Sequence, residues 1–162
     1  MPYRPPNRSP SVSAVFSRAF FFCLVLAGVV AGATGVRAAE QGVVVSDPWV
    51  RFIMPARPAA GYFTLANKTS RPRTLVGASS PACGMLMLHR SVSESGVERM
   101  TMLKGVDVPA HGDVVFAPGG YHLMCMSPSA AMIPGRSVPV TLRFRNGDEV
   151  TASFSVRGVT GK

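Results

Sequence analysis

The sequence predicts an all-β protein, built as a single antiparallel β-sandwich or barrel. From Gly42 onward, apolar residues either alternate with polar ones or form short runs, as they do in strands. Clusters of Gly, Pro, Asn, Asp and Ser separate these segments at regular intervals. Prolines interrupt the few segments that start with a helical period. We therefore expect little helix, at most about one turn.

The first 38 of the 162 residues have the pattern of a secretory signal peptide. Three arginines and no acidic residue precede an apolar run at 19–30, and small residues lead to Val36-Arg37-Ala38. We expect cleavage after Ala38 and export of the rest of the chain. A membrane anchor is the alternative, but the uncharged run from Ala19 to Val36 has 18 residues, the lower limit for a span, and its second half is weakly apolar. A lipid anchor is disfavoured because three phenylalanines precede Cys23.

Residues 39–162 are predicted to form one domain without stable membrane insertion. The first 38 residues carry four of the 17 basic residues and none of the 8 acidic ones, so the rest has a net charge of +5. Its 13 basic residues are scattered, without the basic runs and interleaved aromatic residues typical of nucleic-acid binding. The charge favours solubility and attraction to an acidic partner or a membrane surface.

Ten short segments satisfy the strand pattern. They are Val43–Ser46, Trp49–Ile53, Gly61–Asn67, Arg73–Ser79, Met85–Ser91, Val97–Leu103, Asp113–Phe116, Tyr121–Met126, Val138–Phe144 and Glu149–Val156. The last two alternate most clearly, and Asn146-Gly147 between them predicts a hairpin with a type I′ turn. Two cysteines, Cys83 and Cys125, lie in the domain and either pair in an oxidising compartment or stay as small buried residues.

Methionine and histidine are concentrated in one half of the domain. Seven of the eight methionines after residue 38 lie between Met85 and Met132, as do all three histidines. Strand parity places thioethers and imidazoles on one face and leucines on the other. The shared faces are Met85, Met87 and His89, then Met100 and Met102, then His122, Met124 and Met126.

Two interpretations of this cluster compete. A single methionine is more often a core filler than a ligand, and His111, between Pro109-Ala110 and Gly112, has the setting of a turn histidine. A strand face on which a histidine alternates with methionines is poorly suited to the core, however, because a buried imidazole needs a polar partner. Thioethers and neutral imidazoles suit Cu(I) better than hard cations or structural zinc. The group therefore favours a Cu(I) site.

Three other functions remain as alternatives. The methionines could form an apolar face of a non-metal envelope domain that binds another protein. A blue-copper electron carrier would need a cysteine thiolate, but parity points Cys125 away from His122 and Met124. Catalysis is disfavoured because no Ser-His-Asp, Cys-His or paired-carboxylate arrangement is apparent.

The spacing of four of these residues resembles a known signature. Ten residues separate His89 from Met100, twenty-one separate Met100 from His122, and one separates His122 from Met124. This spacing resembles the H-x10-M-x21-H-x-M motif of the periplasmic copper chaperone family PCuAC. Three flanking segments are also similar to the family: Ala60–Leu65, Gly77–Pro81 and Pro118–Met124. The resemblance covers about Val43 to Val156.

The resemblance implies a cupredoxin-like fold and a carrier in the periplasm rather than an enzyme. It implies that His89, Met100, His122 and Met124 bind Cu(I). Strand parity places Met87, Met102 and Met126 on the same faces as these ligands, which makes them candidates for outer or alternate donors. The acceptor implied is cytochrome c oxidase subunit II or a Sco-type protein. We expect Gly119-Gly120 to let its loop approach the Met100 strand closely. Residues 157–162 contain neither His nor Met, so a second copper site at the C-terminus is not expected.

Overall fold

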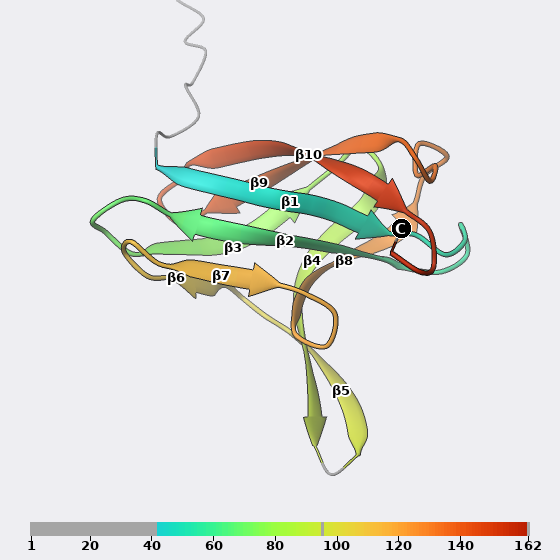
Figure 1. Ribbon diagram of the computed structural model, residues 1–162, viewed down its shortest axis with the longest axis horizontal. Helices are drawn as coiled ribbons and strands as arrows, with labels where there is room; N and C mark the ends of the chain where they lie inside the picture. Colours follow the sequence, from blue (N-terminus) through green and yellow to red (C-terminus); the bar gives the residue numbers. More distant parts are fainter. Residues whose placement is uncertain (1–41, 95, 162) are drawn as a thin grey trace, which may run out of the picture. The chain divides into compact units, whose positions relative to one another are not determined.

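The computed structural model describes residues 42–94 and 96–161 and contains ten β-strands (Figure 1). The strands are β1 (Val43–Arg51), β2 (Ala59–Asn67), β3 (Arg73–Ser79), β4 (Cys83–Glu94), β5 (Val97–Met102), β6 (Val106–Val108), β7 (Asp113–Phe116), β8 (Tyr121–Pro128), β9 (Ser137–Phe144) and β10 (Glu149–Arg157). These described residues include no helix, which confirms the all-β prediction. The predicted signal peptide, residues 1–38, lies outside them.

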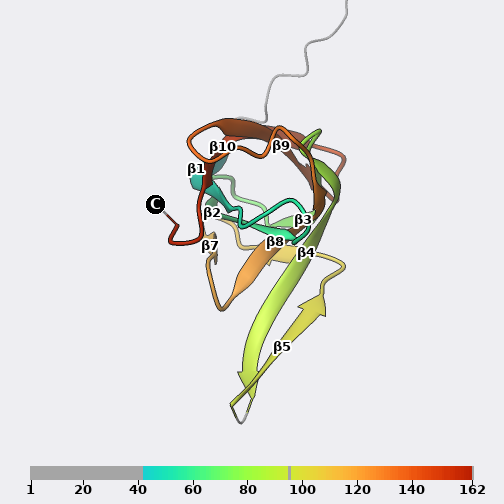
Figure 2. The same cartoon turned by 90° about the vertical axis from the view of Figure 1, so that its right-hand side faces the viewer.

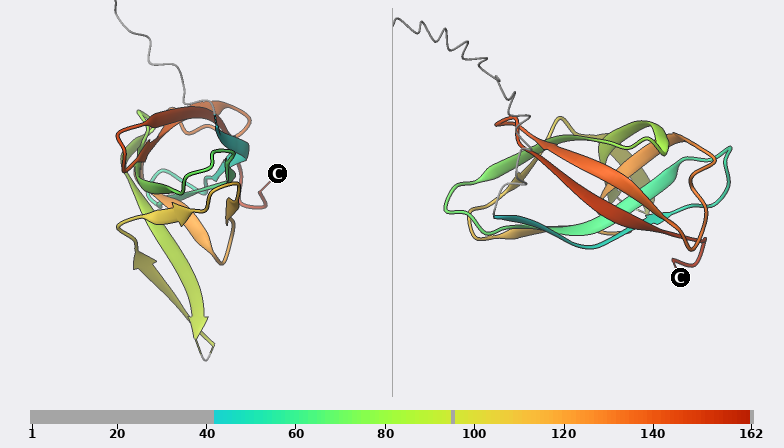
Figure 3. Two further views of the ribbon diagram at one scale, coloured as in Figure 1. Left: turned by 90° about the vertical axis from the view of Figure 1, so that its left-hand side faces the viewer. Right: turned by 90° about the horizontal axis from the view of Figure 1, so that it is seen from above.

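The strands close into a barrel. Pairing runs through β4, β8, β2, β1, β10, β9 and β3 and returns from β3 to β4. The end-on views in Figures 2 and 3 show this closure, with β9 and β10 forming the wall opposite β8. Most neighbours are antiparallel, while β1 with β10 and β7 with β8 are parallel. Closure leaves few free edges, and β5 and β6 extend the sheet beyond the ring.

The barrel interior is filled by alternate residues of each strand. In β9, Val138, Val140, Leu142 and Phe144 are buried, as the sequence pattern predicts. Facing aromatic rings add contacts, with Phe63 stacked on Phe116 at 4.3 Å between ring centroids. Fully burying each such aliphatic or aromatic side chain contributes about 1.5–3 kcal/mol. This packed core gives the outer face a rigid support.

Three local features differ from the sequence expectations. Strand β1 is one strand, where the sequence predicted two. Asp47 adopts a positive φ and the register shifts between Ser46 and Trp49, but pairing with β2 continues on both sides of this irregularity. Strand β6 was not predicted, since three residues are too few to show alternation. The Asn146-Gly147 hairpin is present, but the type I′ prediction is wrong: Gly147 has a positive φ and Asn146 does not. A connection longer than the two-residue loop of a type I′ turn accommodates a single residue in the left-handed conformation.

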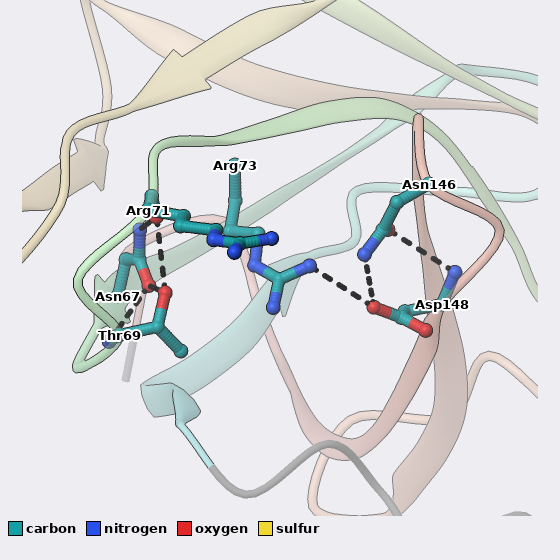
Figure 4. A network of polar contacts seen from close by, with 6 residues as sticks. All are labelled: Asn67, Thr69, Arg71, Arg73, Asn146 and Asp148. Atoms are coloured by element: carbon teal, nitrogen blue, oxygen red, sulfur yellow. Dashed lines mark hydrogen bonds and ion pairs between the residues drawn. The ribbon is translucent and has the colours of Figure 1, made fainter.

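A polar network fastens the β2–β3 and β9–β10 turns (Figure 4). Asn67 is fully buried, and its side-chain amide donates to the backbone carbonyls of Arg71, at 2.7 Å, and Pro109, at 3.0 Å. Its side-chain carbonyl accepts from the Thr69 hydroxyl at 2.7 Å. Arg73 forms an ion pair with Asp148 at 3.2 Å. Satisfying these buried groups avoids the desolvation cost of an unpaired amide.

The β4–β5 hairpin projects beyond the barrel (Figures 1 and 2). In the described part of the chain, β5 pairs with β4 alone, and it carries Met100 and Met102. The hairpin therefore extends the outer face of β4 and β8. Among the described residues, no helix is long and apolar enough to cross a membrane.

Candidate metal centre

Strands β4 and β8 separate their leucines from their sulfur and imidazole side chains. Leu88, Leu123 and Cys125 lie in the core, and Leu86 packs against it. Alternate residues point to opposite faces, so the histidines and the neighbouring methionines occupy the outer face. The sequence prediction that leucines lie on one side and thioethers and imidazoles on the other is confirmed.

The register places the two motif histidines side by side. His89 of β4 lies opposite His122 of β8, and their ring centroids are 5.8 Å apart. Met102 of β5 lies opposite His89 on its other side, and Met100 lies opposite Ser91. Residues directly opposite in an antiparallel pair share a face, with Cβ atoms about 4.5–5.5 Å apart. These donors therefore belong to one surface.

The contacts of His122 orient its imidazole and leave its Nε2 nitrogen free. Its Nδ1 lies 3.1 Å from the carbonyl oxygen of Gly120, which accepts a hydrogen bond when Nδ1 carries the proton. This contact leaves the Nε2 lone pair available, as in many metal-binding histidines. Tyr62 packs near the His122 ring at 6.4 Å between centroids, and His122 is 5% exposed despite its position on the outer face. The imidazole is thus oriented before any metal binds.

His89 has a buried nitrogen without a partner. Its Nδ1 is buried and makes no hydrogen bond to the described residues. Burial, followed by the proximity of His122, lowers the pKa of His89 below its usual value of 6.5. A buried polar atom without a partner is costly, and a neutral imidazole is the form that binds metals. Both properties fit a metal ligand.

Two motif methionines line a hollow beside His122. The hollow has a volume of about 340 Å³, and its lining includes Met100, Met124, His122 and Ser91 together with Tyr62. The lining also includes Ile53, Arg57 and Pro58 of the β1–β2 connection. Met100 is 62% exposed, whereas Met124 is partly buried. The structure thus brings His122, Met100 and Met124 to one hollow. It places His89 next to this hollow, beside the His122 ring.

The cysteines form a disulfide on the other side of β8. Cys83 and Cys125 are bonded, with their Cα atoms 5.5 Å apart, which answers the question left open by the sequence. Cys125 is also buried in the core, on the face opposite Met124. It cannot supply a thiolate to the outer face, so the blue-copper alternative lacks its required ligand.

The donors present define the class of metal that the face suits. Within residues 42–94 and 96–161, no group of three or more His, Cys, Asp or Glu side chains is arranged to hold an ion. Hard cations prefer several carboxylate or carbonyl oxygens, and structural zinc prefers thiolates or more histidines. Two imidazoles and two thioethers form a neutral, soft donor set. Such a set suits a soft monovalent ion.

Some residues around the centre were missed by the sequence reasoning. Trp49 and Tyr62 lie opposite each other in β1 and β2, with ring centroids 4.7 Å apart, and extend the row that contains His122. The Arg51 guanidinium lies 5.4 Å from the Tyr62 ring centroid. Burial raises the pKa of Tyr62, although Arg51 opposes this shift. Alternation within β1 and β2 was visible in the sequence, but their position beside β8 was not.

The role expected of Gly119-Gly120 needs correction. Gly119 adopts φ +81°, and no atom lies within 4 Å of where its Cβ would be. A Cβ on Gly120 would contact only the Ala117 carbonyl, at 3.6 Å. Backbone conformation, and not close approach of the loop to the Met100 strand, therefore explains Gly119. The loop instead reaches β4 through its backbone, where the Ser91 amide donates to the Gly120 carbonyl at 3.0 Å.

Comparison with known proteins identifies the family. The family model described as "Putative lipoprotein LpqE-like" matches residues 43–156. The chain belongs to the LpqE-like family. It is also 33% identical over 152 residues to "Putative lipoprotein Lxx21020" of Leifsonia xyli subsp. xyli, an alignment that covers 89% of this chain and 91% of that protein. The range matched by the family model contains the positions of all four residues of the His/Met motif.

Solved structures agree with this LpqE-like barrel. The copper-bound PCuAC domain from PmoF2 has a TM-score of 0.61 at 24% identity, covering 72% of this chain and 93% of that domain, and shows the shared fold. The Cu(I) form of DR1885 from Deinococcus radiodurans is 29% identical, with a TM-score of 0.55, covering 78% of this chain and 83% of that protein. The resemblance to PCuAC domains is confirmed, as is the cupredoxin-like fold that it implied.

Proposed function

We propose that this protein binds Cu(I) outside the cytoplasm and carries it to an acceptor protein by ligand exchange. The observation that carries the proposal is that two imidazoles and two thioethers come together on the outer face of β4, β5 and β8. The similarity to the Cu(I) form of DR1885 supports copper as the metal. A neutral donor set leaves Cu(I) with its single positive charge.

The four ligands divide into a fixed part and an exchangeable part. His122 is oriented by its contact with Gly120, and His89 lies beside it with a lowered pKa, which favours the neutral form of His89 that binds metals. Met124 lines the hollow from β8, whereas Met100 is largely exposed on the projecting hairpin. During transfer, an acceptor ligand would form a bond to copper as the Met100 sulfur–copper bond breaks. Copper stays in the Cu(I) state throughout.

The proposed location is the periplasm. The Cys83–Cys125 disulfide is typical of proteins in oxidising compartments. The relative from Leifsonia xyli subsp. xyli carries the name of a lipoprotein, which is a class of exported protein. A site made without thiolates also suits an oxidising environment, because thioethers do not form disulfides. These observations support an extracytoplasmic location for the proposed carrier.

The proposed acceptor is the copper centre of cytochrome c oxidase subunit II, reached directly or through a Sco-type protein. A transfer assay tests this. The Cu(I)-loaded protein is mixed anaerobically with the metal-free soluble domain of oxidase subunit II, or with a Sco-type protein, and copper in each is measured after separation. We expect copper to move to one of these acceptors.

Two controls define the result. His89→Ala should fail to retain copper through the initial loading step, whereas His111→Ala, at an exposed turn, should load and transfer normally. Normal copper affinity in His89→Ala would contradict the ligand assignment. Loaded protein that releases copper to neither acceptor would contradict the delivery role while leaving copper binding intact.

A further inference from the structure

The outer face of β4 and β8 carries more sulfur than the proposed centre uses. Below the His89–His122 pair, the register continues with Met87 opposite Met124 and then Met85 opposite Met126. Met124 belongs to the proposed centre. The sequence placed Met87 and Met126 only as outer or alternate donors of that centre, and it gave Met85 no role of its own. The two strands therefore present consecutive rows of soft donors.

Packing does not account for the outer pair. Met132 is the methionine that fills the core among the described residues, at 3% exposure. Met85 is 57% exposed and Met126 is 38% exposed. The core contacts of β4 and β8 come from their leucines, from Cys83 and Cys125, and from Tyr121. Met85 and Met126 are thus available to a ligand from solvent.

The geometry allows these thioethers to converge. Directly opposite residues in an antiparallel pair have Cβ atoms about 4.5–5.5 Å apart, and methionine side chains are long and flexible. Met87 lies two residues from Met85 on the same face and offers a third sulfur. A hollow of about 340 Å³ next to Met126 is lined by Pro55, Arg57, Pro58 and Pro128, with no carboxylate in its wall. The surroundings therefore favour a soft ion over a hard one.

The hollow beside Met126 adjoins the one beside His122. Arg57 and Pro58 of the β1–β2 connection line both hollows, and consecutive residues of the outer face of β8, Met124 and Met126, line one each. Met87 and Met124 form the row between the histidine pair and the outer methionine pair. An ion could pass from one row to the next over about the spacing of two strand residues, roughly 7 Å.

We propose that Met85, Met87 and Met126 form a second, weaker site for a soft monovalent ion, next to the His/Met centre. It binds less tightly because it lacks imidazole donors. The ion moves between the sites by exchange of neutral ligands: a bond to Met124 or a histidine forms as a bond to Met87 or Met85 breaks, and no electron is transferred. The identity of the ion as Cu(I) rests on the proposed function, whereas the site itself rests on the arrangement of the three thioethers.

A titration with Ag(I), a stand-in for Cu(I) that does not change oxidation state, tests the proposal. The exported protein is labelled with ¹³C at the methionine methyl groups, and the assigned methyl signals are followed by NMR. We expect the Met100 and Met124 signals to shift with the first equivalent of Ag(I), and the Met85, Met87 and Met126 signals with the second. The double variant Met85→Leu/Met126→Leu should lower the stoichiometry from two to one and preserve the first phase.

The control variant is Met132→Leu, which also removes one methionine but from the core, and it should keep both phases. A first phase with no second phase, or a second phase that persists in Met85→Leu/Met126→Leu, would overturn the second site alone. A shift of the Met85 and Met126 signals without any shift of Met100 and Met124 would support the second site and contradict the proposed centre. No silver binding at all would overturn both.

Discussion

The two motif histidines share a row but have different surroundings. His122 has its Nδ1 directed at a backbone carbonyl, and His89 has a buried Nδ1 with no hydrogen bond to the described residues. The first arrangement fixes a tautomer, and the second leaves a polar atom that gains a partner when a metal binds. The cost of that unpartnered atom falls on the metal-free protein. We infer that metal binding stabilises the barrel as well as filling the site.

The metal-free protein should lose stability as the pH falls below about 6.5, the usual histidine pKa. The folded state lowers the pKa of His89, because burial and then His122 disfavour its charged form. The unfolded chain therefore takes up a proton first, so the contribution of His89 is complete above the unfolded pKa and is lost as pH falls toward the folded pKa. Urea unfolding between pH 5 and 8 measures this.

The variant His89→Gln should flatten the pH dependence, since glutamine does not titrate. His111→Gln is the matched control, because His111 lies exposed in a turn, and its curve should keep the slope of the original protein. If the His89→Gln curve and the original curve run parallel over this range, His89 is not the group responsible.

At the scale of elements, the loop between β7 and β8 orients the centre through its backbone. Gly119 supplies a positive φ, and Gly120 supplies the carbonyl that contacts His122 and Ser91. Gly119→Ala should destabilise the protein by roughly 1–2 kcal/mol, because a residue with a Cβ is strained in the left-handed region. Thermal unfolding measures the loss. Gly120→Ala is the matched control, with no positive φ and only an ordinary contact of the Cβ with the Ala117 carbonyl, and equal losses in the two variants would contradict the conformational explanation.

The disulfide joins the two strands that carry most of the donors. Cys83 begins β4 and Cys125 lies in β8, 42 residues apart in sequence. Replacing both by Ser should destabilise the protein by about 2–5 kcal/mol. The folded variant should still bind one equivalent of Cu(I) tightly, because Cys125 faces the core. Binding is measured below the new unfolding temperature, and loss of copper from a variant that remains folded by circular dichroism would make a cysteine thiol a ligand.

For the whole molecule, the sequence predicted the strands and the shared faces but not the closure. Alternation in β4, β8, β9 and β10 is a local property, so burial of Leu88, Leu123 and Val140 could be anticipated. Closure depends on pairings between distant segments, such as β1 with β10 and β8 with β2, and local patterns do not encode them. The prediction of a type I′ turn between β9 and β10 was wrong for a related reason. Asn-Gly permits several turn types, and the strand register selects one of them.

The sequence likewise predicted the donors of the candidate site but not their surroundings. Its sulfur and imidazole donors follow from composition and parity, since both are visible in the printed sequence. Tyr62, Arg57 and the hollow between β8 and the β1–β2 connection depend on how β2 lies against β8. The His89–His122 contact likewise depends on the β4–β8 register, which a spacing of 32 intervening residues does not determine.

Export of the chain is a further prediction at this scale. Expressed with residues 1–38 in a bacterial host, the protein should appear in the periplasm with Ala39 as its first residue. Intact-mass measurement of the periplasmic protein checks this. A mass that corresponds to a lipid-modified chain beginning at Cys23, or an uncleaved chain in the membrane fraction, would contradict the predicted cleavage after Ala38.

The central claim is that this face binds copper through methionine sulfur. The most direct measurement is an anaerobic Cu(I) competition titration of the exported protein against a chromophoric chelator, compared with Met100→Leu/Met124→Leu and with the core variant Met132→Leu. Leucine preserves an apolar surface but cannot bind copper. We predict one tightly held equivalent in the original protein and in Met132→Leu, and its loss in the double variant. Equal retention of copper by all three, or no copper withheld from the chelator by any, would contradict the claim and leave the face as an apolar contact surface.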